Sequence, residues 1–169
     1  MPFLLHAMRF QSYFNTAVKL INAYGGSVPL AHYLKQYFTQ HKKHGSKDRK
    51  YIAHLCYCYY RLGYALKGLP VVERLKAALF ICNESIEEWT ILFNEEWLAH
   101  HTPLLNERIQ FIQSIYPFGI KDIFPWQVQL SEGIDNTAFA ASHLIQPDLF
   151  LRVRPGKKNA VVQKLQQQN

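Results

Sequence analysis

The 169-residue chain has few cysteines and no long hydrophobic run, and each shortage excludes a class of protein. Three cysteines, an odd number, argue against a disulfide framework and fit the reducing cytoplasm, where we expect the protein. No run approaches the roughly 18 apolar residues of a membrane span, so we expect no membrane association. The first residues, MPFLLHAMRFQ, lack the basic segment and the cleavage site of a secretory signal.

Residue patterns typical of catalytic and metal sites are also missing. Cys56 and Cys58 are two positions apart on a predicted helix, so they point about 200° apart and cannot ligate one metal ion together. Gly25-Gly26 follows a predicted helix and is interpreted as its terminator rather than as a phosphate-binding loop. No nucleophile is paired with a base. The chain by itself is therefore predicted to be non-catalytic, without a metal or a cofactor.

The chain has a net charge of +7, and its charged residues are unevenly distributed along the sequence. Residues 1–83 carry twelve Lys and Arg against two Asp and Glu, whereas residues 84–135 carry two against nine. Residues 136–169 carry five against one. Basic regions at both ends thus flank an acidic middle, a pattern that favours a polyanionic partner.

The hydrophobic periodicity predicts a largely helical chain. Apolar residues one turn apart, helix caps and the positions of Pro and Gly predict helices over 9–24, 27–40, 46–66, 71–82, 85–101, 103–116, 136–143 and 158–168. The start of the fifth helix carries the clearest cap, because Ser85 and Glu88 fit a capping box. The segment between Pro117 and Asp135 is predicted to be irregular.

The last residues differ from the rest, because residues 149–153 are predicted to form a strand before a basic turn and the final helix. A lone strand has no pairing partner and is not stable by itself. We therefore predict an all-α domain over residues 1–146, and in residues 147–169 the beginning of a second domain that is truncated at Asn169.

The helix that follows the run HKKHGSKDRK is predicted to carry a basic face. At about 100° per residue, five side chains lie within about 60° of one direction: Lys47, Lys50, His54, Tyr57 and Arg61. Such a face is often only solvated, but solvated faces usually mix charges, and this one has no Glu. Spaced cations can each meet an RNA phosphate, and a Tyr among them can stack on an unpaired base. Both interpretations stay open on charge alone.

Two segments resemble the RsmB/Nop2/Sun family of RNA cytosine methyltransferases. GSKDRKYIAHLCYCYYRLGYAL resembles a helix of their NusB-like N-terminal domain, although only Lys47 separates Ser46 from Asp48 where the family has two residues. PDLFLRVRPGKKNAVVQKL is similar to the strand, turn and helix that begin their RRM-like subdomain, with Arg154 in place of the usual Asn. Together the two segments cover 41 of the 169 residues.

The resemblance implies a NusB-like helical bundle followed by the first βα unit of an RRM-like (ferredoxin-like) subdomain. In the family, a Rossmann-like core further along the chain binds S-adenosylmethionine and carries the catalytic cysteines, one of them in a Pro-Cys motif. None of Cys56, Cys58 and Cys82 follows a proline, so no catalytic residue is assigned. The cofactor is expected in the parent protein, in a missing C-terminal methyltransferase core.

The expected partner is RNA, and ribosomal RNA by resemblance. The predicted RNA-binding residues form a helical set and a C-terminal set: Lys42, Lys43, Lys47, Arg49, Lys50, His54, Tyr57 and Arg61, then Arg152, Arg154, Lys157 and Lys158. Two alternatives remain. The chain is a stand-alone NusB-like module for transcription antitermination or protein interaction, or a structural domain whose basic face docks on an acidic partner.

Overall fold

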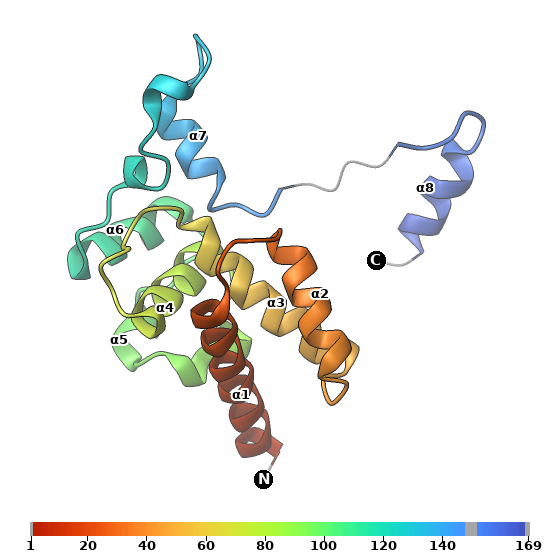
Figure 1. The fold of residues 1–169 in the computed structure, drawn as a ribbon, viewed down its shortest axis with the longest axis horizontal. Coiled ribbons are helices and arrows are strands. Elements are labelled where there is room, and N and C mark those ends of the chain that lie inside the picture. Colours follow the sequence, from red (N-terminus) through yellow and green to blue (C-terminus); the bar gives the residue numbers. More distant parts are fainter. Residues whose placement is uncertain (1, 148–151, 168–169) are drawn as a thin grey trace.

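The computed structural model describes residues 2–147 and 152–167, and helices are the regular structure of both stretches (Figure 1). The α-helices are α1 (Pro2–Ala23), α2 (Leu30–Gln40), α3 (Ser46–Arg61), α4 (Val71–Cys82), α5 (Glu95–Ala99), α6 (Leu105–Ile115), α7 (Asn136–Ser142) and α8 (Lys158–Gln166). Short 3₁₀ helices are η1 (Glu87–Leu92), η2 (Ile120–Asp122) and η3 (Gln127–Gln129). The predicted all-α class is confirmed, since the described residues contain no strand.

Helices α1, α3 and α4 pack against one another around the hydrophobic core (Figure 1). Each contributes side chains that repeat at helical spacing, such as Phe10 and Phe14 of α1 and Ile52 and Leu55 of α3. Helix α4 is apolar on nearly all sides and lies between α3 and α6. Its central position explains why α4 has the most completely buried sequence of the bundle.

Several predicted helices are confirmed nearly to the residue. Helix α4 has the predicted bounds, and α2, α6 and α7 differ from the predictions by a few residues at their ends. Asp135 caps α7, because its carboxylate accepts the backbone N–H of Ala138 at 2.6 Å. Residues 117–135 are irregular apart from η2 and η3.

Three other predictions about the helices are wrong. Helix α1 begins at Pro2 rather than near Arg9. Helix α3 ends at Arg61 rather than Leu66, because Gly63 and Leu66 both take positive φ angles. The predicted helix over 85–101 is two pieces, η1 and α5, separated at Phe93 and Asn94.

The predicted strand over 149–153 falls mostly on residues 148–151, which lie outside the described residues. Arg152 and Val153, which are described, have no regular secondary structure. Helix α8 follows a turn at Pro155-Gly156, as predicted, and its described residues include no buried side chain. The βα unit therefore stays a prediction, with only its helix observed.

Candidate nucleic-acid interface

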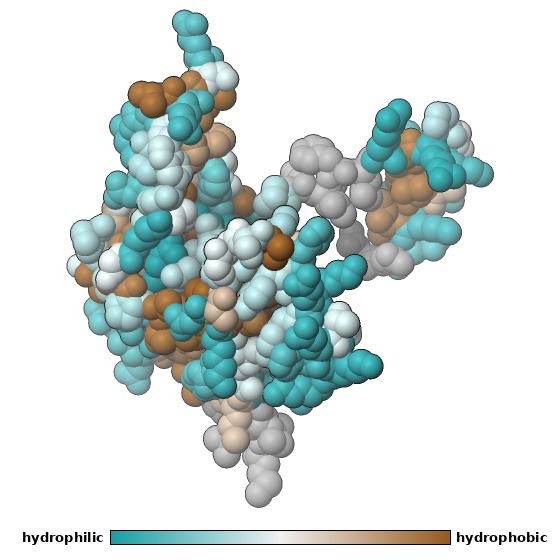
Figure 2. Space-filling model, viewed as in Figure 1, coloured by the Kyte–Doolittle hydropathy of each residue, from teal (hydrophilic) through white to brown (hydrophobic). Residues whose placement is uncertain are grey.

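The turn between α2 and α3 presents cations to solvent at the end of the bundle. Lys42 and Lys43 lie in the turn, and Lys47 and Lys50 lie in the first turns of α3; all four are exposed. Hydrophilic side chains gather over this end of the molecule, where α2 meets α3 (Figure 2). Among the described side chains, these four lysines form no salt bridge. The charges of this basic turn are therefore open to an external anion.

Asp48 lies among these lysines but faces the protein. Its carboxylate accepts the Tyr13 hydroxyl, and its other oxygen accepts the backbone N–H of Gly45 at 2.8 Å, which caps the start of α3. The Tyr13 hydrogen bond, with the help of the Gly45 N–H, lowers the pKa of Asp48. Burial, together with the bond to Asp48, raises the pKa of Tyr13 to about 12. Asp48 thus fixes α1 to the start of α3 rather than neutralising the lysines.

Arg49, the other predicted cation near this turn, is held by the chain itself. Its Nε donates to the carbonyl of His44 at 2.8 Å, and its guanidinium lies 6.0 Å from the Phe38 ring centre. The side chain is nevertheless exposed. Arg49 therefore stabilises the basic turn and presents its remaining N–H groups outward.

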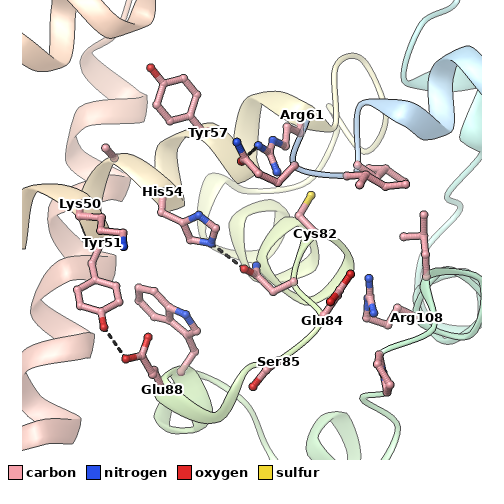
Figure 3. Close-up of a pocket in the computed structure, with 18 residues that line it drawn as sticks. Lys50, Tyr51, His54, Tyr57, Arg61, Cys82, Glu84, Ser85, Glu88 and Arg108 are labelled. Carbon is pink, nitrogen blue, oxygen red and sulfur yellow. Dashed lines mark hydrogen bonds between the residues drawn. The ribbon is translucent and has the colours of Figure 1, made fainter. Parts of the chain in front are cut away.

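The rest of the predicted helical face lines a groove of about 1050 Å³ beside α3 (Figure 3). Lys50, His54, Tyr57 and Arg61 contribute to one wall, which belongs to α3. The facing side consists of the loop after α4 and the start of η1, with Arg108 of α6 and the residues after α7. The structure thus brings four of the sequence-predicted residues together in one concave site.

His54 points into this groove but is bound by a neighbouring helix. Its Nε2 lies 2.7 Å from Asn83 Oδ1, and because Asn83 Nδ2 donates to the Leu79 carbonyl, Nε2 is assigned as the donor. The Cys58 sulfur lies 3.5 Å from the same nitrogen, and this contact raises the pKa of His54. His54 is therefore a positioning contact between α3 and the end of α4, with limited freedom to reach a phosphate.

Arg61 lies at the far end of the groove and is partly engaged. One terminal nitrogen, Nη2, donates to the side chain of Gln146, which follows α7. The other, Nη1, is buried without a hydrogen-bond partner among the described atoms. A buried guanidinium nitrogen without an acceptor is costly, but Nη1 is enclosed by protein atoms and is not exposed to a ligand in the groove. Tyr57, in contrast, is 41% exposed, and its ring is directed away from the facing wall (Figure 3).

The carboxylates on the facing wall were not predicted as part of the site. Glu84 and Glu88 are exposed and line the groove opposite Lys50 and Arg61 (Figure 3). Glu88 accepts the hydroxyl of Tyr51, and this hydrogen bond raises the pKa of Tyr51 to about 12. The sequence signal for these carboxylates is the acidic run in residues 84–88, where Ser85 and Glu88 also fit a capping box. The groove therefore has a basic wall and an acidic wall.

Arg108 is a third residue of the groove that sequence reasoning missed. It is only 3% exposed, and it donates from Nε to the Ile81 carbonyl at 2.9 Å and from Nη1 to the Thr102 carbonyl at 2.7 Å. Burial lowers the pKa of its guanidinium. Because its donors are directed at backbone carbonyls, Arg108 builds the floor of the groove instead of offering a free charge.

Two of the three cysteines near this site are buried thiols of the core, and the third is half-buried. Cys56 and Cys58 are buried, and burial raises the pKa of Cys56 to about 12. Cys82 lines the groove and carries a thiol whose pKa is raised by its contact with Cys58. Within the described residues, no group of three or more His, Cys, Asp or Glu side chains is arranged to hold a metal ion.

The C-terminal set of predicted cations is exposed. Arg152 and Arg154 lie in the irregular segment before the Pro155-Gly156 turn, and Lys157 and Lys158 lie at the start of α8. The Lys157 backbone N–H closes the turn by donating to the Arg154 carbonyl at 3.1 Å. The turn thus places these four cations on a short stretch of exposed chain.

Comparison with protein-family models, with curated proteins and with solved structures gives no match for this chain. Among the described helices, none is long and apolar enough to cross a membrane.

Proposed function

We propose that this chain is the N-terminal RNA-binding region of an S-adenosylmethionine-dependent RNA 5-methylcytosine methyltransferase that acts on ribosomal RNA. The observation that supports RNA binding is the exposed basic turn (Lys42, Lys43, Lys47 and Lys50), which is continuous with the groove beside α3. The methyltransferase assignment and the choice of ribosomal RNA rest on the resemblance of residues 45–66 and 147–165 to the RsmB/Nop2/Sun family.

RNA binding is supported by the availability of these charges. The lysines of the basic turn are solvated, and the carboxylate of Asp48 is occupied by Tyr13 and Gly45. Each cation that meets a phosphate releases condensed counterions, so such a surface binds RNA with an affinity that falls as salt rises. Contacts of this type position an RNA without reading its sequence. The exposed C-terminal cations supply a second surface of the same kind.

Catalysis is assigned to a core outside these residues. The catalytic core of this family includes a Pro-Cys motif, and none of Cys56, Cys58 and Cys82 follows a proline. We expect this chain to transfer no methyl group from S-adenosylmethionine to RNA. Measurable transfer by the purified chain would contradict the assignment.

The RNA-binding proposal is tested by titrating a fluorescently labelled single-stranded RNA with the protein between 50 and 200 mM salt. We expect the affinity to fall steeply over this range. The variant Lys47→Glu/Lys50→Glu should weaken binding to every RNA sequence. The control variant Lys19→Glu/Lys121→Glu makes the same charge change at exposed sites outside the groove. Salt-independent binding, or equal effects of the two variants, would contradict the proposal.

The methyltransferase assignment has its own test in the coding sequence downstream of the codon for Asn169. We expect a glycine-rich cofactor loop and a Pro-Cys dipeptide in the same reading frame. A stop codon at that point would contradict the assignment and favour a NusB-like binding module.

A protein-interaction module is the second candidate, and a specific observation supports it. Val128 of η3 is 96% exposed, and Trp126 and Ile134, two and six residues from it in the sequence, are 38% and 47% exposed. Exposed large apolar side chains are found on protein contact surfaces. Retention of a protein partner that the variant Val128→Asp abolishes, together with an absence of RNA binding, would favour this candidate.

A further inference from the structure

The two walls of the groove beside α3 carry opposite charges. Lys50 and Arg61 lie on the α3 wall, and Glu84 and Glu88 lie on the facing wall, with Ser85 between them (Figure 3). These two acidic residues are exposed, whereas the basic turn next to the groove has no carboxylate directed outward. A ligand that fills the groove must therefore present negative charge on one side and hydrogen-bond donors on the other.

The opposite charges of the two walls favour single-stranded RNA over double-stranded RNA. A duplex presents phosphates along both of its edges, so one backbone would be repelled by the acidic wall. A single strand has phosphates on one side and unpaired base edges on the other, which matches the two walls. The groove is large enough for such a ligand, since its volume of about 1050 Å³ is slightly above the range of about 300–1,000 Å³ found for small-molecule pockets.

The chemistry of the acidic wall also distinguishes among bases. A carboxylate accepts hydrogen bonds and donates none, so it favours the exocyclic amino groups of cytosine, adenine and guanine. Uracil presents carbonyl oxygens at its exocyclic positions, and these would face the carboxylates unfavourably. Glu88 is already oriented, because the Tyr51 hydroxyl donates to one of its oxygens and leaves the second free of that bond.

We propose that this groove holds one RNA strand, with its phosphates on Lys50 and Arg61 and an amino-bearing base against Glu84 and Glu88. The inference rests on the proposed RNA-binding function and adds strand and base selectivity to it. Arg61 lines the groove and is half-buried, and its guanidinium is held at the end of the groove by its bond to Gln146. Tyr57 lies on the outer side of the same helix, where its exposed ring can stack on a neighbouring base.

The test compares three labelled 12-nucleotide probes with the full chain: oligouridine, the same strand with three central cytosines, and that second strand paired with its complement. We expect the cytosine-containing strand to bind roughly five- to tenfold more tightly than oligouridine, in line with a few added base contacts. The duplex should bind more weakly than the single strand of the same sequence.

The variant Glu84→Gln/Glu88→Gln replaces acceptors by amides that both accept and donate, so it should remove the preference for cytosine. Glu95→Gln/Glu96→Gln is the matched control, because it removes two exposed carboxylates on α5 outside the groove. The control should keep the preference. Circular dichroism of both variants verifies that the helical fold is retained.

Each outcome bears on one of the two proposals. If no probe binds at low salt, the RNA-binding function fails and the inference fails with it. If all probes bind equally, or if the duplex binds best, RNA binding stands and the strand-selective groove is overturned. Loss of the cytosine preference in the Glu95/Glu96 variant as well would overturn the assignment of selectivity to the groove.

Discussion

At the scale of single residues, the least expected feature is a pair of buried arginines whose hydrogen bonds go to backbone carbonyls. Arg74 donates to the carbonyls of Gly63 and Ala65, and Arg108 donates to those of Ile81 and Thr102. Each is 3% exposed. Their guanidinium groups bind backbone carbonyls in irregular segments and in the last turn of α4, where the chain would otherwise bury unpaired acceptors.

Replacement of Arg108 by Met should therefore destabilise the protein strongly. The change leaves the carbonyls of Ile81 and Thr102 without their donors, and we expect the free energy of unfolding to fall by about 3 kcal/mol. Urea denaturation followed by circular dichroism measures the change. Arg154→Met, at an exposed site, is the control and should change stability by less than about 0.5 kcal/mol. Equal losses in the two variants would contradict this role for Arg108.

Asp48 gives a prediction about pH. Its folded-state pKa is lowered, first by the Tyr13 hydrogen bond, below its ordinary value of 3.8. Its ionised form therefore stabilises the fold above about pH 4, and this contribution is lost as the pH falls through the lower folded-state pKa.

Asp48→Asn should accordingly lower the free energy of unfolding at pH 7 and make it less sensitive to acid between pH 5 and pH 2. Urea denaturation across this range measures both effects. Glu132→Gln, at an exposed position away from Tyr13, should leave the acid sensitivity unchanged. An Asp48 variant with the acid sensitivity of the parent protein would show that the Tyr13–Asp48 bond contributes no pH dependence.

At the scale of elements, sequence patterns correctly predict those helices whose start, end and buried face are determined by residues within or next to the helix. Helix α4 follows Pro70 and is predominantly apolar, so both its start and its burial could be predicted from the sequence. The helix predicted from the capping box at Ser85 was wrong for a tertiary reason. Glu88 is bound by the Tyr51 hydroxyl, 37 residues earlier in the chain, and Asn94 begins a separate helix by accepting the Trp97 N–H.

In the candidate site too, features set by local sequence were predictable and features set by tertiary contacts were not. Periodicity alone placed Lys47, Lys50 and Tyr57 on an exposed face of α3, and the structure exposes all three. It could not show that His54 is bound by Asn83, 29 residues later, or that Glu84 and Glu88 face the helix. Contacts between distant segments depend on how the elements pack, which helical periodicity does not specify.

The turn after α3 contains Gly63, whose replacement should destabilise the protein. Gly63 has a φ of +51°, and a Cβ added there would lie 2.0 Å from the carbonyl oxygen of Ile123, to which Tyr64 also donates its N–H at 3.2 Å. Gly63→Ala must therefore push the Ile123 backbone away as well as strain the turn. We expect a loss of stability of at least about 2 kcal/mol.

Gly133→Ala is the control for this change. Gly133 also has a positive φ, +84°, but an added Cβ there would meet no atom within 4 Å. Its loss should be about 1 kcal/mol, which is the cost of the backbone conformation alone. Thermal denaturation of the two variants compares them, and equal losses would show that the contact with Ile123 is unimportant.

At the scale of the whole molecule, RNA could be attracted by the net charge of +7 or bound by cations at defined positions, and these two explanations predict different effects of removing cations. A net charge attracts any polyanion, so removing cations anywhere would weaken binding equally. A binding surface depends on position, because only cations that meet phosphates release counterions. The basic turn and the C-terminal set (Arg152, Arg154, Lys157 and Lys158) are such positions in our proposal.

Two variants that each lose four cations decide between these possibilities. One changes the C-terminal set to Gln, and the other changes Arg9, Lys19, Lys67 and Lys121, which are exposed outside both basic surfaces. Each lowers the net charge from +7 to +3. If the C-terminal set binds phosphates, its loss should reduce the slope of log affinity against log salt by about 3, and the control should barely change it. Equal slopes would mean that overall charge, rather than this surface, attracts RNA.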